Sequence, residues 1–269
     1  TQGIRVSFVG CDDRGLIDPE EVLAAVDTDT VLVSLMLVNN EIGTIQPIRK
    51  IAERLRRRGL AFHTDAVQAA GKIPIDVSTL GVDLLSISGH KIGGPKGIGA
   101  LYLRRDVPFS PPWKGGHQES GRRPGTENVP AIVGLAAAME NAERHRAKES
   151  TRLQKLKQCL WDGIRDEIRD VALNGDWTRS VANTLNVSFQ GLDGEAAMMA
   201  LDREGIAVST GAACLVGAAM PSHVLEAMCL DPSRCRSALR FSLGTETTHR
   251  DVRTVLELLP PLIARLRKK

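Results

Sequence analysis

An apolar run followed by an amphipathic helix is the feature that most constrains how this chain can fold. Residues 30–37 read TVLVSLML, a continuous apolar stretch of strand length that is typical of a strand buried on both faces. Residues 48–58 then repeat apolar side chains at helical spacing. Four of these side chains share one helical face: Ile48, Ile51, Ala52 and Leu55. Strand, loop and helix in this order predict a mostly parallel sheet covered by helices.

The remainder of the first half repeats this unit. A helix is expected from Asp18 onward, because Asp18 is a favourable N-cap and Pro19 fits the first helical position. Further short strands are expected in segments rich in apolar residues, at residues 4–9, 60–64, 83–88 and 99–104. The predicted fold class is therefore α/β.

The pattern changes after a long helical stretch from about residue 129 to residue 168. Two later segments, residues 183–189 and 237–243, alternate polar and apolar side chains as half-exposed strands do. Helices are expected at residues 194–203, 222–228 and 248–267, the last opened by Thr248 and Asp251 at capping-box spacing. We therefore expect a large domain in residues 1–128, and a linker helix with a smaller α/β domain in residues 129–269.

Composition excludes several classes of function. The formal net charge is +3, from 35 basic and 32 acidic residues, so direct nucleic-acid binding is not expected. No apolar run approaches the roughly 18 to 20 residues that span a bilayer. The start of the chain has no signal-peptide pattern, and a cytoplasmic location is expected, with an organelle matrix as the alternative.

The cysteines do not form a disulfide or zinc pattern. Their number is five, which is odd, and none of them forms a CxxC pair. Cys229 and Cys235 lie near His223 in the sequence, but at a spacing unlike that of a zinc knuckle, so no metal site is expected.

Four residues together indicate pyridoxal phosphate chemistry on a sulfur substrate. Lys91 follows an apolar strand in the run SISGHK, where it would emerge at the carboxyl-end edge of the sheet that commonly binds ligands. Asp65 ends the preceding strand and points to the same edge, with Gln68 just after it. An acid there can keep a pyridine ring nitrogen protonated, a lysine can form an imine, and Cys214 supplies a thiol among small residues.

Three of these residues also have an ordinary structural interpretation. Lys91 could be one more solvated lysine, Asp65 a helix cap, and Cys214 a small buried hydrophobe. The glycines after Lys91 resemble a nucleotide phosphate loop, but the order GxxxxGK[ST] is absent and a strand follows in place of a helix. We therefore reject the nucleotide interpretation.

The chain resembles the cysteine desulfurases, fold-type I pyridoxal phosphate enzymes of the class-V aminotransferase type. The resemblance rests on six ordered blocks that cover nearly the whole chain: VNNEIGTIQP, FHTDAVQAAGKIPID, LLSISGHKIGGPKGIGALYLRR, GRRPGTENVPAIVGLAAA, VSTGAACL and LRFSLG. It implies a large domain with a mostly parallel sheet, and a smaller C-terminal domain.

The resemblance also assigns residue roles. Lys91 would form the imine with the cofactor and move the α-proton, and Asp65 would pair with the pyridine nitrogen. Asn40 and Gln68 would contact the ring hydroxyl, while Ser88 and His90 would hold the phosphate, with His90 also counted among the catalytic residues. Thr126 resembles the family threonine that reaches the phosphate of a neighbouring subunit, which implies a homodimer.

The substrate side of the site is assigned in the same way. The Cys214 thiolate would take the sulfur of the cysteine substrate as a persulfide and release alanine, and could serve as a transient iron–sulfur ligand. Arg240 would clamp the substrate carboxylate, a bidentate task suited to guanidinium, and Asn40 would assist; the ordinary alternative for Arg240 is a strand-edge salt bridge. Cys229 stands where the family often has glycine.

One part of the family pattern has no counterpart here. Thr1 aligns inside the large domain, and the upstream portion that supplies a ring-stacking histidine and a phosphate loop is absent from the sequence. None of the six histidines takes the stacking position: His63, His90, His117, His145, His223 and His249. The chain is expected to be either a piece of a full enzyme or a degenerate product.

The resemblance implies a cysteine desulfurase that supplies sulfur for iron–sulfur cluster assembly or tRNA thiolation, with a sulfur-acceptor or scaffold protein as partner. Selenocysteine lyase is the nearest enzymatic alternative, since the same residues can act on the selenium analogue. A non-catalytic, partner-binding subunit is an alternative of another class. A conventional aminotransferase is disfavoured, because it has no use for the thiol of Cys214.

Overall fold

The computed structural model describes residues 3–210 and 222–267. They form two compact units, each assembled from separate parts of the chain. The sheet unit contains Asp27–Leu37 and Ile48–Ala147. The C-terminal unit contains Thr1–Val26, Val38–Pro47 and Lys148–Lys269.

The interleaving of the two units differs from the single boundary expected after residue 128. Segment Val38–Pro47 joins the C-terminal unit through the backbone: Val181 N–H donates to the Gly43 carbonyl at 3.0 Å, and Ile45 N–H donates to the Arg179 carbonyl at 2.7 Å. Backbone pairing therefore ties an early segment to late residues. The expected boundary between the large domain and the smaller C-terminal domain at residue 128 stays a prediction.

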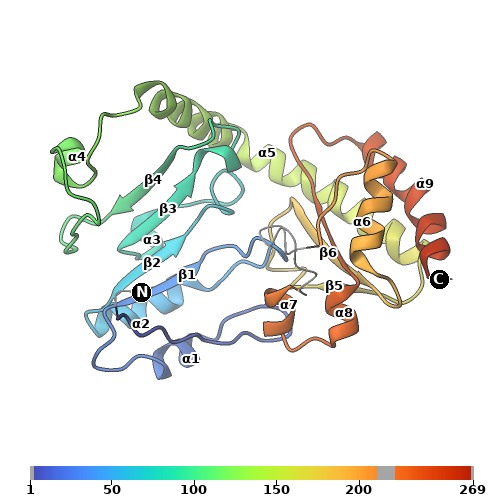
Figure 1. Cartoon of the computed structure of the whole chain (residues 1–269), viewed down its shortest axis with the longest axis horizontal. Helices are drawn as coiled ribbons and strands as arrows, with labels where there is room; N and C mark the ends of the chain where they lie inside the picture. Colours follow the sequence, from blue (N-terminus) through green and yellow to red (C-terminus); the bar gives the residue numbers. More distant parts are fainter. Residues whose placement is uncertain (1–2, 211–221, 268–269) are drawn as a thin grey trace. The chain divides into compact units, whose positions relative to one another are not determined.

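The sheet unit is built on a four-stranded, mostly parallel sheet, which confirms the predicted fold class (Figure 1). The strand order is β1-β2-β3-β4, with β4 antiparallel to β3. The expected helical face packs toward this sheet, since Ile48, Ile51, Ala52 and Leu55 are all buried. The bounds are β1 (Leu32–Met36), α2 (Ile48–Arg57), β2 (Ala61–Asp65), α3 (Val77–Leu80), β3 (Leu84–Ser88) and β4 (Gly99–Leu103).

Two expectations about the first strands are wrong. The run 30–37 is not buried on both faces: Val31, just before β1, is 77% exposed, and Leu32 is 48% exposed. β1 is an edge strand, with β2 on one side only within the described residues. Residues 4–9 form no strand either, and Phe8 is 93% exposed. An alternating segment becomes a strand only where a neighbouring strand pairs with it in a ladder, and residues 4–9 belong to no ladder of the described sheets.

One long helix, α5 (Val129–Glu167), contributes to both units, as the sequence predicts. Its first half packs closely on the turns of the sheet unit. A Cβ atom on Gly71 would lie 2.8 Å from the Ala142 Cβ, and one on Gly94 would lie 3.2 Å from the Ala138 Cβ. Small residues on both sides therefore allow α5 to hold the turns that follow β2 and β3. The short α4 (Gln118–Gly121) lies before it in the chain.

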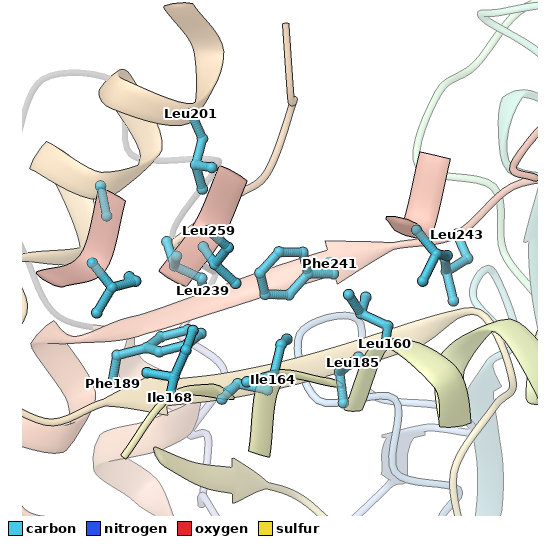
Figure 2. Packing of buried hydrophobic residues seen from close by; sticks show 14 of the residues in the cluster. Leu160, Ile164, Ile168, Leu185, Phe189, Leu201, Leu239, Phe241, Leu243 and Leu259 are labelled. Carbon is cyan, nitrogen blue, oxygen red and sulfur yellow. The ribbon is translucent and has the colours of Figure 1, made fainter. Parts of the chain in front are cut away.

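The C-terminal unit has its own antiparallel sheet, in the order β5-β6-β7. One face carries the main hydrophobic core, in which Leu185 and Phe189 of β6 pack near Ile164 and Ile168 (Figure 2). The second half of α5, α6 and α9 cover this face. The bounds are β5 (Val171–Asn174), β6 (Thr184–Phe189), β7 (Ala238–Ser242), α6 (Gly194–Arg203) and α9 (His249–Leu266). The sequence analysis missed β5.

The prediction that residues 183–189 form a half-exposed strand is wrong, because every residue of β6 is buried. The polar face of β6 meets other protein groups in place of water. Asn174 Nδ2 donates to Asn186 Oδ1 at 2.8 Å and contacts Ser188 Oγ at 2.7 Å. Asn186 Nδ2 donates to the Glu41 carbonyl at 3.2 Å. The alternating side chains of β6 therefore place an apolar core on one face of the strand and a buried hydrogen-bond network on the other.

The predicted helix starts are confirmed. Asp18 caps α1 (Pro19–Ala24) by accepting from Glu20 N–H, and Thr248 and Asp251 make both bonds of a capping box at the start of α9. The remaining helices of the described chain are α7 (His223–Ala227) and α8 (Pro232–Arg236). No helix within residues 3–210 and 222–267 is long and apolar enough to cross a membrane.

Cys229 adopts a backbone conformation that favours glycine. Its φ is 54°, in the left-handed region that side chains with a Cβ rarely occupy. Glycine, which the family resemblance predicts at this position, would adopt this conformation without strain. The described thiols of Cys11, Cys159, Cys229 and Cys235 are free. In the described part of the chain, no three His, Cys, Asp or Glu side chains gather as a metal site would require.

A buried lysine joins α5 to the loop before β6. Lys157 is 2% exposed, and its Nζ donates to Ser180 Oγ at 2.8 Å and to the Val181 carbonyl at 3.1 Å. The same Nζ lies 4.9 Å from the centre of a Trp177 ring. Burial lowers the pKa of Lys157 to about 8.

This pKa predicts a pH-dependent stability. Between about pH 8 and about pH 10 the unfolded chain keeps the Lys157 proton while the folded chain releases it, so the free energy of unfolding rises with pH. We expect the wild type to gain about 2 kcal/mol over this window relative to Lys157→Met. Urea unfolding of both proteins at the two pH values measures the difference. A difference that does not change with pH would mean that Lys157 titrates normally.

Candidate active site

The ends of β2 and β3 gather five of the predicted site residues in the sheet unit. Asp65 is the last residue of β2 and Ser88 is the last residue of β3. The strands are parallel and Asp65 is in register with Ser86, so both ends reach the same edge of the sheet. We call Asp65, Gln68, Ser88, His90 and Lys91 the strand-end cluster.

The turn after β3 is shaped by Gly89. A Cβ atom on Gly89 would lie 2.9 Å from the Ile98 Cγ2 and 3.0 Å from the Pro95 carbonyl oxygen, so only glycine fits without displacement. The Gly89 N–H donates to the Ile98 carbonyl at 2.9 Å, and the Gly89 carbonyl accepts from Gly94 N–H at 2.8 Å. A short 3₁₀ turn, Gly89–Lys91, follows, and both His90 and Lys91 are exposed on it. The Lys91 amine is therefore accessible at a turn that the backbone holds firmly.

Ser88 and His90 contact each other at the same turn. The Ser88 Oγ lies 2.7 Å from the His90 Nδ1, within hydrogen-bond distance. A hydroxyl and an imidazole next to Lys91 form a polar group suited to an anionic oxygen ligand such as a phosphate.

The carboxylate of Asp65 is held in place by its own turn and lies near His63. Its Oδ1 accepts from the Val67 N–H at 2.8 Å. His63 lies two residues earlier on β2, with Nδ1 2.8 Å from Ser34 Oγ and Nε2 3.2 Å from Ser86 Oγ. Burial lowers the pKa of His63, and the charge of Asp65 opposes this shift. Asp65 is not a helix cap, since the residues that follow it form turns.

The structure adds Lys72, which the sequence analysis missed. Lys72 Nζ donates to Gln68 Oε1 at 2.8 Å. Burial, with a smaller contribution from the charge of Lys91, lowers the pKa of Lys72 to about 8. The sequence signal for this contact was the spacing of Gln68 and Lys72, four residues apart.

The C-terminal unit brings together two other predicted residues. Arg240 lies on β7, and its Nη1 donates to the Asn40 carbonyl at 3.0 Å. Its Nε is buried and has no hydrogen-bond partner among the described residues. A buried guanidinium N–H that lacks a partner suits a carboxylate ligand, because leaving such a donor unpaired costs free energy. In the described part of the chain, Arg240 forms no salt bridge with a carboxylate, so the strand-edge salt bridge is not supported.

Cys214 lies outside the described residues, but the residues that flank its segment are placed. On one side, Ser209 pairs with Arg240, with the Arg240 N–H donating to the Ser209 carbonyl at 2.6 Å. On the other side, Ser222 Oγ donates to the buried Glu41 carboxylate at 2.5 Å. Both flanks therefore contact the neighbourhood of Asn40 and Arg240 in the C-terminal unit.

Thr126 lies in the loop before α5, in the sheet unit, and is exposed. The predicted residues thus fall into two groups, the strand-end cluster of the sheet unit and the Asn40–Arg240 pair of the C-terminal unit. Gly89, His63 and Lys72 support the first group, and Glu41 lies next to the second.

Comparison with known proteins decides the family. The model of the aminotransferase class-V family matches residues 1–255. A cysteine desulfurase of Gluconacetobacter diazotrophicus is 45% identical over 268 residues, which are 100% of this chain and 67% of that protein. The chain belongs to the cysteine desulfurase family. The cysteine desulfurase IscS of Methanosarcina thermophila is similar at 46% identity, over 99% of this chain and 66% of that protein. This member of the family thus spans about two thirds of the length of these relatives.

Solved structures agree with the family. A NifS-like protein superposes with a TM-score of 0.90 at 37% identity, covering 98% of this chain and 70% of that one. The NifS-like protein from Rickettsia africae superposes with a TM-score of 0.87 at 31% identity, covering 95% and 69%. The desulfurase-family chain therefore has the fold-type I architecture that its sequence implies.

Cysteine desulfurases depend on pyridoxal phosphate, and the residues of this chain fit that group. The strand-end cluster offers an accessible amine on Lys91, an oriented carboxylate on Asp65, and the Ser88–His90 pair for a phosphate. The charges of Lys72 and Lys91 are close enough to affect each other, so this edge is also positive where an anionic cofactor would bind.

Proposed function

We propose that this chain catalyses the removal of sulfur from L-cysteine, forming L-alanine and a persulfide on Cys214. In this reaction the Cβ–S bond of the substrate breaks and an S–S bond forms on Cys214. The thiol proton and the electron pair of the broken bond end at the substrate Cβ, which becomes the methyl group of alanine. Atoms and electrons balance without an external oxidant.

The observation that carries the proposal is the strand-end cluster. Lys91 stands exposed on a fixed turn, next to Ser88 and His90 and at the same sheet edge as Asp65. An amine, a carboxylate and a phosphate-binding pair in this arrangement serve amino-acid chemistry with pyridoxal phosphate. The relatives named cysteine desulfurase give the substrate class.

In the sheet unit, each residue has a role that its position supports. Pyridoxal phosphate, when bound, supplies an electron sink for the substrate α-carbon. Asp65 holds the proton on the pyridine nitrogen, and Lys91 moves the α-proton of the substrate. Ser88 and His90 bind the phosphate, and Gln68 donates to the ring oxygen.

In the C-terminal unit, Arg240 binds the substrate carboxylate with its Nε–H, which has no partner among the residues that the structure describes, while the Asn40 carbonyl orients the guanidinium. The contact of the Asn40 side chain with the ring oxygen stays a prediction from the family resemblance. Cys214 accepts the sulfur, as the family resemblance implies. The described residues on either side of its segment, Ser209 and Ser222, contact Arg240 and Glu41.

The wider setting is proposed from the family. The chain forms a homodimer in which Thr126 reaches the phosphate of the neighbouring subunit, a role that its exposed loop position allows. The persulfide passes to a sulfur-acceptor or iron–sulfur scaffold protein in the cytoplasm. Selenocysteine lyase is not favoured, since the relatives compared above are named cysteine desulfurases.

The visible absorption spectrum tests the proposed site. When the purified chain is mixed with pyridoxal phosphate, we expect a Schiff-base band that borohydride abolishes, and mass analysis should find the reduced adduct on the peptide containing Lys91. An accessible amine at a polar, positive edge is the physical reason. Labelling scattered over surface lysines, or the absence of a band, would contradict the assignment.

A further inference from the structure

The contact between Lys72 and Gln68 suggests a role for a lysine outside the family assignments described above. We propose that Lys72 is a positioning residue that fixes the orientation of the Gln68 carboxamide toward the cofactor ring. This inference rests on the proposed function, because it concerns how Gln68 meets the ring oxygen. Lys72 itself contacts neither cofactor nor substrate in the proposal.

The first step of the argument is the direction of the hydrogen bond. Lys72 Nζ lies 2.8 Å from Gln68 Oε1, and a protonated amine can only donate. With its pKa at about 8, Lys72 keeps its proton at neutral pH. The oxygen of the Gln68 amide must therefore face Lys72, which turns the amide nitrogen away from it.

The second step is what the amide presents to a ligand. A glutamine side chain has two nearly equivalent amide orientations, one offering a donor and the other an acceptor. The ring oxygen of pyridoxal phosphate is an anionic acceptor, so only the donor orientation binds it. By holding Oε1, Lys72 selects that orientation of Gln68 before the cofactor arrives.

The third step is the rigidity of Lys72 itself. Lys72 N–H donates to the Ala69 carbonyl at 3.0 Å, in the turn that follows β2 (Figure 1). Gly71 packs against Ala142 of α5, where an added Cβ would lie 2.8 Å from the Ala142 Cβ. The ammonium is partly buried, which explains its lowered pKa. A lysine anchored in this way can hold Gln68 at little further entropic cost.

A double-mutant cycle tests the proposal with spectroscopic measurements. We expect Lys72→Met to weaken pyridoxal phosphate binding about tenfold and to raise the pKa of the Schiff-base band by about one unit. The exposed Lys96 gives a matched control, and Lys96→Met should change neither value. Lys72→Arg retains a charged donor and should recover most of the binding. Thermal unfolding of the cofactor-free variants checks that each one folds.

The Gln68→Ala background decides between positioning and an independent effect. If Lys72 acts through Gln68, Lys72→Met should change binding less than about twofold in that background, since the two losses are not additive. Losses that multiply would overturn the proposal, as would a Lys72→Met variant that behaves like the wild type. A wild type without a Schiff-base band would overturn the proposed function and this inference together, so the two failures are distinguishable.

Discussion

Replacing Lys91 with alanine is expected to abolish the Schiff-base band and to lower the rate of alanine and sulfide formation from L-cysteine by about 10⁴-fold. Lys91 is the exposed amine of the Gly89–Lys91 turn, and the proposal gives it both the bond to the cofactor and the transfer of the α-proton. No other residue of the strand-end cluster can supply both. Absorbance and product analysis, with added pyridoxal phosphate, measure the loss.

Two further variants separate the role of Lys91 from that of the thiol. Cys214→Ala is expected to keep the band and lose sulfide release, because the cofactor site remains while the sulfur acceptor is gone. Lys96→Ala, at an exposed lysine a few residues from Lys91, should keep both. Normal sulfide release by Cys214→Ala would remove this cysteine from the mechanism, and activity in Lys91→Ala would remove the lysine.

Replacing Phe189 with alanine is expected to lower the free energy of unfolding by about 4 kcal/mol. Phe189 is 0% exposed in the core of the C-terminal unit, where Figure 2 places it near Ile168. Truncation removes the buried ring and leaves a cavity between β6 and the end of α5, which the packed neighbours can only partly fill. Urea denaturation followed by circular dichroism measures the change.

Met199 provides the control for this prediction. It lies on α6 in the same unit and is 60% exposed, so Met199→Ala should change the free energy of unfolding by less than about 0.5 kcal/mol. Equal losses for the two variants would mean that the face of β6 carrying Phe189 is not the core of this unit.

The sequence predicted the strand ends of the candidate site well. Asp65 and Ser88 close β2 and β3 as expected, because apolar runs of strand length end where polar side chains begin. The capped starts of α1 and α9 were equally readable, since a cap depends on residues within one helical turn.

Contacts across long stretches of sequence were not readable in this way. Two hydrogen bonds join residues far apart in the chain: Arg240 donates to the Asn40 carbonyl, and Ser222 donates to the Glu41 carboxylate. No local sequence pattern predicts them. The buried polar face of β6 misled the reading for the same reason, because alternation shows that two faces differ and does not reveal what covers each. The hydrogen bond from Lys72 to Gln68 is local in sequence, but the burial of the Lys72 amine, which lowers its pKa, depends on the tertiary structure.

The sequence by itself determined most of the elements, the fold class and the family, because strands, caps and chemical motifs are properties of short segments. Only the tertiary structure decided that Val38–Pro47 belongs with the C-terminal sheet, that Lys72 is partly buried where it bonds Gln68, and that the Arg240 Nε is buried without a hydrogen-bond partner among the described residues. The physical reason is that burial and hydrogen-bond partners are set by which distant segments meet, and desolvation then fixes the charge and orientation of each side chain.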